Sequence, residues 1–191
     1  AGHPTIGTAH VLVASGEVQP TADERARGEL TVVLGENVGP VPVRITLDAG
    51  QPVRGQLTTA QLPEERTEVT DLDALASTLS LSADDFVGGT HAPVGASCGL
   101  PFLIMPLRSS DAVARARLDM AAWEKVLKGK WAAWPMVFSM VHEEDQSSWP
   151  AHVRGVDIRA RVCVPGSTVP EDPATGSANA AWASGRLAGI L

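Results

Sequence analysis

Two stretches of sequence decide the fold: EDPATGSA at residues 171–178 and AGHPT at residues 1–5. Each combines glycine, proline and a short polar side chain at the point where a helical pattern of small apolar residues begins. The first N–H groups of a helix have no partner inside the helix and lie at the positive end of its dipole. Glycine lets a ligand approach the backbone closely. Each stretch therefore predicts a helix start that can bind a small anion.

Both stretches also have an explanation that needs no ligand. Asp172 and Ser177 are residue types that commonly cap a helix, and a single His3 is more often a hydrogen-bonded structural residue than a catalytic one. A pattern P-x-x-G-[ST]-A is shared by residues 4–9 and 173–178 and indicates a repeat, but it is short enough to arise by chance. The residues alone leave helix capping and anion binding both open.

The rest of the chain alternates between strand and helix patterns in two groups. The charged, proline-containing stretch 61–71 is expected to be a linker. It separates the remainder of an N-terminal half (1–68) from a truncated C-terminal half (69–191), which predicts two α+β halves. Strands are expected at 29–34, 41–48, 53–58, 94–98, 101–107, 135–142 and 153–164. Helices are expected at 4–15, 72–79, 109–128 and 173–187, the second capped by Thr70 or Asp71.

Composition narrows the class of protein. The 191 residues carry a net charge of −7, so neither nucleic acid nor an anionic membrane is an expected partner. No apolar run is long enough to span a bilayer, which favours a cytoplasmic protein. Cys98 and Cys163 lack the spacing of a disulfide framework or zinc site and are expected to be buried thiols. The stretch 142–145 with His152 is better explained by a solvated turn than by a metal site, and no cofactor motif is evident.

The two stretches resemble the signatures of the PhzF-like phenazine biosynthesis family. Residues 171–178 look like its EDPATGSA signature and residues 1–9 are similar to its AGHPTLGTA segment, while 161–165 and 61–63 fit its pattern in the same order. The resemblance implies a diaminopimelate-epimerase-like fold, in which two pseudo-symmetric halves each wrap a curved sheet around a central helix, and a homodimer. It implies substrate-binding positions, between the two halves, at Gly2, His3, Asp172, Gly176 and Ser177.

The same resemblance implies a cofactor-independent isomerase. Epimerases of this fold use two cysteines at the helix starts, and this chain has none there, so racemisation by two thiols is disfavoured. PhzF-like enzymes are instead similar to isomerases that move a proton within a cyclic amino acid such as trans-2,3-dihydro-3-hydroxyanthranilate. Gly176 and Ser177 are expected to hold the substrate carboxylate, while His3 and Asp172 act as catalytic residues by orienting the substrate and relaying the proton.

The chain departs from the family pattern at both ends. In the family, the catalytic Glu lies before the Gly-His motif and a further C-terminal portion follows the ATGSA helix. This sequence contains neither segment and is therefore expected to be a fragment. The alternative function is a non-catalytic protein of the same fold that binds a small carboxylate or dimerises.

Overall fold

The computed structural model describes residues 2–142, 146–147, 149–150 and 154–183. The chain forms two compact units, Ala1–Leu62 and Pro63–Leu191. The division between them comes at the beginning of the expected linker, whereas the sequence placed the boundary after residue 68. The two units are described separately below.

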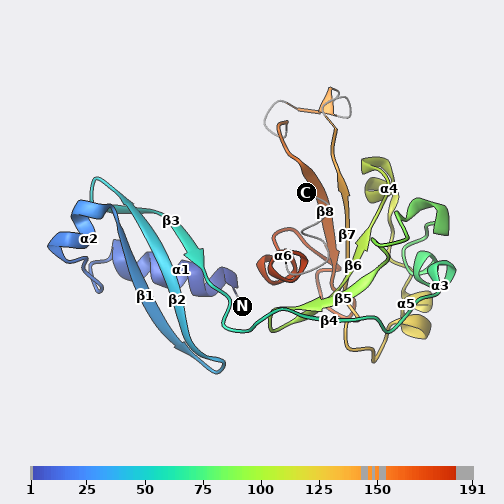
Figure 1. Ribbon diagram of the computed structural model, residues 1–191, viewed down its shortest axis with the longest axis horizontal. Helices are drawn as coiled ribbons and strands as arrows, with labels where there is room; N and C mark the ends of the chain where they lie inside the picture. The colour runs from blue at the N-terminus through green and yellow to red at the C-terminus, as the bar shows by residue number, and fades with distance from the viewer. Residues whose placement is uncertain (1, 143–145, 148, 151–153, 184–191) are drawn as a thin grey trace. The chain divides into compact units, whose positions relative to one another are not determined.

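The first unit is an antiparallel sheet with a helix along one face (Figure 1). The strands follow one another in the order β1-β2-β3, joined by tight turns. The elements are α1 (Gly2–Ala14), α2 (Ala22–Arg27), β1 (Glu29–Glu36), β2 (Gly39–Asp48) and β3 (Gln51–Leu57). The helix at 4–15 and the three strands expected here are confirmed.

Alternating side chains bury one face of this sheet against α1. On β2 the buried residues are Val41, Val43, Ile45 and Leu47, with exposed or half-buried residues between them. Because α1 packs closely on β3, a Cβ atom at Gly55 would lie 2.6 Å from the side chain of Ile6. A glycine is therefore needed there for the helix to approach the sheet.

Helix α2 was not expected, although the sequence carries a signal for it. The hydroxyl of Thr21 accepts a hydrogen bond from the Glu24 amide, and the Glu24 carboxylate accepts one from the Thr21 amide. The bond from that amide lowers the pKa of Glu24. Gly28 then ends the helix in the left-handed conformation, with a φ of 72°.

The second unit is built on a sheet that, in the described part of the chain, has six strands in the order β4-β5-β6-β7-β8-β9. Only β6 and β7 run parallel, and the connection between them carries α4 and α5. Its strands are β4 (Glu64–Arg66), β5 (Val94–Ser97), β6 (Pro101–Pro106), β7 (Pro135–Met140), β8 (Ile158–Cys163) and β9 (Glu171–Asp172). Its helices are α3 (Leu72–Ser77), the short 3-10 helix Ala83–Asp85, α4 (Ser110–Arg115), α5 (Met120–Val126) and α6 (Gly176–Trp182).

Helices cover both faces of this second sheet (Figure 1). On one face Phe102, Ile104 and Phe138 pack with Ala178 and Ala181 of α6. On the other, the alternate residues of the same strands pack with α3, α4 and α5; these include Leu103, Met105, Val137 and Cys163. Neighbouring residues of one strand thus pack into different hydrophobic cores.

Three expectations for this unit are corrected by the structure. The linker at 61–71 contains β4, whose charged residues suit a strand paired on one side only. The helix at 109–128 is two helices, because the amides of Arg117 and Asp119 bond to the carbonyls of Leu79 and Thr78 instead of continuing the helix. The helix expected at 173–187 begins at Gly176, and its part beyond residue 183 lies outside the described residues.

The α+β class is confirmed. In the part of the chain that the structure describes, no helix has the length and apolar character needed to cross a membrane.

Candidate functional site

The first predicted half of the site is the N-terminal turn of α1. Gly2 is half-buried and His3 is exposed, while Thr5, one turn further along, is buried. A Cβ atom at Gly2 would meet only Leu57 at 3.5 Å, an ordinary contact distance, so packing within this unit does not require glycine there. The imidazole of His3 and the first amides of α1 are therefore presented at one helix end.

A carboxylate that the sequence did not single out lies against this turn. The hydroxyl of Thr5 donates a hydrogen bond to the carboxylate of Glu36, the last residue of β1. Glu17, Glu24 and Glu29 are other carboxylates in this part of the sequence, and Glu24 caps α2. No local pattern indicates Glu36, because its partner lies 31 residues away. The hydrogen bond ties the β1–β2 turn to the first turn of α1.

We expect Thr5→Val to destabilise the first unit by about 1–3 kcal/mol, since it leaves the half-buried Glu36 carboxylate without its hydroxyl donor. Thr8→Val is the matched control, because Thr8 lies on the same helix with an exposed side chain. Urea unfolding followed by circular dichroism measures both. Equal effects of the two substitutions would show that the Thr5–Glu36 hydrogen bond contributes nothing.

The second predicted half lies where β9 passes into α6. Asp172 is the last residue of β9 rather than a helix cap. One of its carboxylate oxygens accepts a hydrogen bond from the Ala174 amide at 3.3 Å and the other accepts one from the Thr175 hydroxyl at 2.7 Å. These bonds form a turn that delays the helix until Gly176, which is why the expected start at Pro173 is wrong.

This turn leaves the first amides of α6 without a capping side chain. Thr175 is the N-cap residue, but its hydroxyl bonds to Asp172 and makes no capping hydrogen bond to the helix. Gly176 is exposed, and a Cβ atom there would meet nothing within 4 Å of it. Ser177 is half-buried, while Ala178 and Ala181 anchor the helix in the core. The start of α6 therefore presents backbone donors beside open space.

Asp172 and the start of α6 are chemically complementary. The carboxylate can accept or donate a proton according to its state, whereas the amides and the Ser177 hydroxyl can donate hydrogen bonds to an acid. Thr175 joins them, since its hydroxyl holds Asp172 and its backbone begins the helix. Thr175 was not among the predicted site residues, although it lies within the quoted motif.

Neither cysteine lies in the first turn of α1 or α6. Cys98 is half-buried, with its sulfur 3.5 Å from the Ala180 carbonyl oxygen. Cys163 is buried on the face of the sheet opposite α6, and burial raises the pKa of its thiol to about 11. A thiol with so high a pKa carries very little thiolate at neutral pH and is a poor proton acceptor there.

Within residues 2–142, 146–147, 149–150 and 154–183, no group of three or more His, Cys, Asp or Glu side chains is arranged to hold a metal ion. Residues 143–145 and His152 lie outside the described residues.

The structure thus brings Asp172, Gly176 and Ser177 together in the second unit. Gly2 and His3 share the N-terminal turn of α1 in the first unit. That both groups serve one substrate stays a prediction.

Comparison with known proteins gives the family. An uncharacterized isomerase from Mesorhizobium japonicum is 34% identical over 186 residues, which cover 96% of this chain and 56% of that protein. A PhzF-family phenazine biosynthesis protein from Bacillus anthracis has a similar fold, with a TM-score of 0.72 at 19% identity over 96% of this chain and 56% of that one. A predicted epimerase from Pseudomonas aeruginosa gives a TM-score of 0.61 at 25% identity over 95% of this chain and 54% of the other.

These similarities confirm the expected epimerase-like fold, and the chain spans about half the length of the relatives it matches. Residues 1–185 match the family of phenazine biosynthesis-like proteins, PhzC-PhzF. Together with the two signature motifs at the starts of α1 and α6, this match shows that the chain belongs to the PhzF family.

Proposed function

We propose that the intact protein is a cofactor-independent isomerase that moves a proton within a small cyclic amino acid bearing a carboxylate, similar to trans-2,3-dihydro-3-hydroxyanthranilate. The observation that carries this proposal is the pairing of Asp172 with an uncapped helix start. The Asp172 carboxylate accepts a hydrogen bond from the Thr175 hydroxyl, and the first amides of α6 have no capping side chain. A carboxylate beside free backbone donors can position a proton and bind an acid at the same place.

Four of the five predicted site residues have a direct role in this proposal. The amides of Gly176 and Ser177, with the Ser177 hydroxyl, hold the substrate carboxylate. Asp172 and His3 orient the amino and hydroxyl groups and relay the proton. One ring carbon loses a proton and another gains one, so substrate and product contain the same atoms and the reaction needs no oxidant or reductant.

The two halves of the site contribute different chemistry. Asp172 is held by two hydrogen bonds, whereas His3 is exposed at the end of α1. A group held in one orientation suits proton transfer at a defined position, and an imidazole can both donate and accept hydrogen bonds with a substrate. Their use on one substrate is part of the proposal.

The experiment follows proton exchange in deuterated water. The intact protein is incubated with trans-2,3-dihydro-3-hydroxyanthranilate, and the product is examined by NMR and mass spectrometry. We expect the product to carry deuterium at the carbon that gains the proton, and His3→Ala to slow the reaction about 10²–10³-fold, the lower part of the range of about 10²–10⁴ for one positioned acid–base group. His10→Ala is the matched control, since His10 is a half-buried histidine of the same helix.

Binding of the substrate without any exchange by the wild-type protein would contradict the isomerase and favour the non-catalytic carboxylate-binding alternative. Equal rates for His3→Ala and the wild type would remove His3 from the mechanism.

A further inference from the structure

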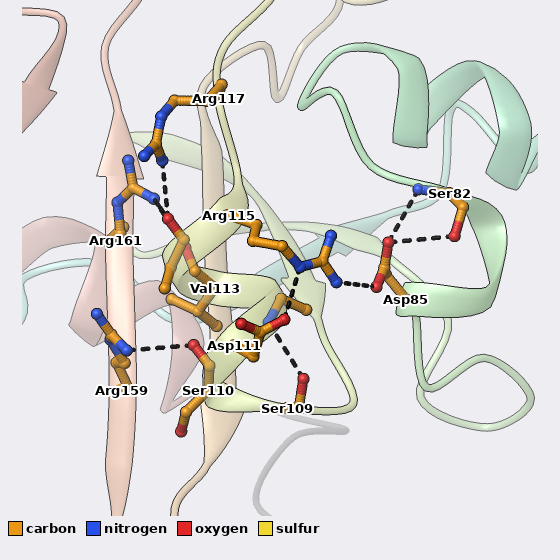
Figure 2. Close-up of polar contacts among 12 residues, drawn as sticks. Ser82, Asp85, Ser109, Ser110, Asp111, Val113, Arg115, Arg117, Arg159 and Arg161 are labelled. Atoms are coloured by element: carbon orange, nitrogen blue, oxygen red, sulfur yellow. Dashed lines mark hydrogen bonds and ion pairs between the residues drawn. The ribbon is translucent and has the colours of Figure 1, made fainter. Parts of the chain in front are cut away.

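The guanidinium group of Arg161 joins β9 to the end of α4. Arg161 lies on β8, and its Nε donates to a carboxylate oxygen of Glu171 at 3.0 Å while its Nη2 donates to the other. Its Nη1 donates to the carbonyl of Val113 at 2.7 Å (Figure 2). The same Nη1 donates to the carbonyl of Ala116 at 2.9 Å, where α4 ends. The side chain is 22% exposed. One arginine thus uses two sides of its planar group to connect two elements.

The register of β9 places Glu171 and Asp172 on opposite faces of the sheet. Glu171 pairs with Cys163, which packs on the side of α4, and Asp172 pairs with Val162, which packs on the side of α6. Since Arg161 and Cys163 are two residues apart on β8, they share a face. The contact of Arg161 with Glu171 therefore fixes the face to which the neighbouring Asp172 is turned.

Besides the contact with Arg161, β9 is held by its pairing with β8 and by the hydrogen bond from the Val164 amide to the Pro170 carbonyl, at 2.9 Å. It consists of two residues and, among the described residues, forms the edge of the sheet. A slip of one residue would turn Asp172 to the face of α4 and away from the α6 start, because side chains alternate along a strand. A bidentate arginine–carboxylate contact has the directionality to prevent such a slip.

We propose that Arg161 is a positioning residue for the active site, which acts through Glu171 to keep Asp172 on the α6 side of the sheet. This role rests on the proposed function of Asp172, but the placement of β9 can be measured without a substrate. Arg161 itself contacts α4 and Glu171 and takes no part in proton transfer.

Arg159 provides a matched control on the same strand and face. It lies two residues before Arg161 and donates to the carbonyl of Ser110 at 3.2 Å (Figure 2). Its guanidinium group also lies over the Trp149 ring, 5.5 Å from the centroid. Among the described residues these contacts join Arg159 to Ser110 and Trp149 and not to β9, so Arg159→Met removes a similar half-buried arginine without releasing Glu171.

The first measurement is hydrogen exchange of the segment 165–176 in the intact protein, with no ligand present. We expect Arg161→Met to lower its protection about tenfold or more, Glu171→Gln to lower it less because one acceptor oxygen remains, and Arg159→Met to leave it unchanged. The same protection in Arg161→Met and the wild type would overturn the proposal, and so would an equal loss in Arg159→Met.

The second measurement is the rate of isomerisation, compared at a temperature where all variants are folded. We expect kcat to fall about 10–100-fold in Arg161→Met with a smaller change in KM, because a displaced acid–base group affects the chemical step most. Arg161→Lys keeps the charge but loses the two parallel hydrogen bonds of the guanidinium group, and it is expected to recover part of kcat. The kcat of Arg159→Met is expected to stay within about twofold of the wild type. Unchanged kcat in Arg161→Met would overturn the proposal. If the wild-type protein showed no turnover, the proposed function would be contradicted instead, and the hydrogen-exchange measurement alone would decide whether Arg161 places β9.

Discussion

Asp172→Asn is expected to lower the rate of proton exchange into the substrate about 10²–10⁴-fold, the largest effect on activity of any single substitution in this chain. The amide that replaces the carboxylate has the same shape and keeps one acceptor oxygen for the Ala174 amide or the Thr175 hydroxyl. It cannot take up and release a proton at neutral pH. The turn before α6 is therefore retained while the acid–base group is lost, and the deuterium content of the product measures the result.

Asp71→Asn is the matched control for Asp172→Asn. Asp71 also accepts backbone hydrogen bonds from the residues that follow it, at 3.0 Å from the Asp73 amide and 3.1 Å from the Ala74 amide, and it caps α3. Its replacement is expected to lower stability slightly and to leave exchange unchanged. If both substitutions slowed exchange equally, Asp172 would have a structural role only.

The local regularities of the fold could be predicted from sequence. Apolar residues alternate with proline or polar residues along β2 and in part along β1, and the turn residues between them fix a hairpin. A helix near each of the two motifs was also indicated, because glycine, proline and short polar residues cluster there. In each of these cases the signal and the structure lie within one short segment.

The parts that sequence did not indicate depend on contacts between distant residues. Thr5 bonds to Glu36 across 31 residues, and Arg161 bonds to Glu171 by way of an edge strand of two residues. The expected helix start at Pro173 was wrong because pairing with β8 places Asp172 at the end of a strand, where its carboxylate bonds to Ala174 and Thr175 and delays the helix. The sequence shows that a residue carries a carboxylate, but the face of the sheet on which this carboxylate lies depends on the strand register.

A large effect on stability is expected from Phe138→Ala on β7. Phe138 is 1% exposed, and its ring meets the indole of Trp182 edge-on, with the centroids 5.5 Å apart and an angle of 76° between the planes. Its removal leaves a cavity between the sheet and α6. We expect the free energy of unfolding of the second unit to fall by about 3–5 kcal/mol, measured by urea unfolding.

Phe86→Ala separates the effect on stability from the effect on the site. Phe86 is also 1% exposed, but it packs in the core that contains α3, α4 and α5 and not in the one that contains α6. Its loss should cost a similar 3–5 kcal/mol or so. Only Phe138→Ala removes a contact of the helix that begins with Gly176 and Ser177, so it alone should raise the KM for the substrate at a temperature where both variants are folded. An equal KM in the two variants would mean that the start of α6 is held by β9 and its turn rather than by the aromatic contact at its far end.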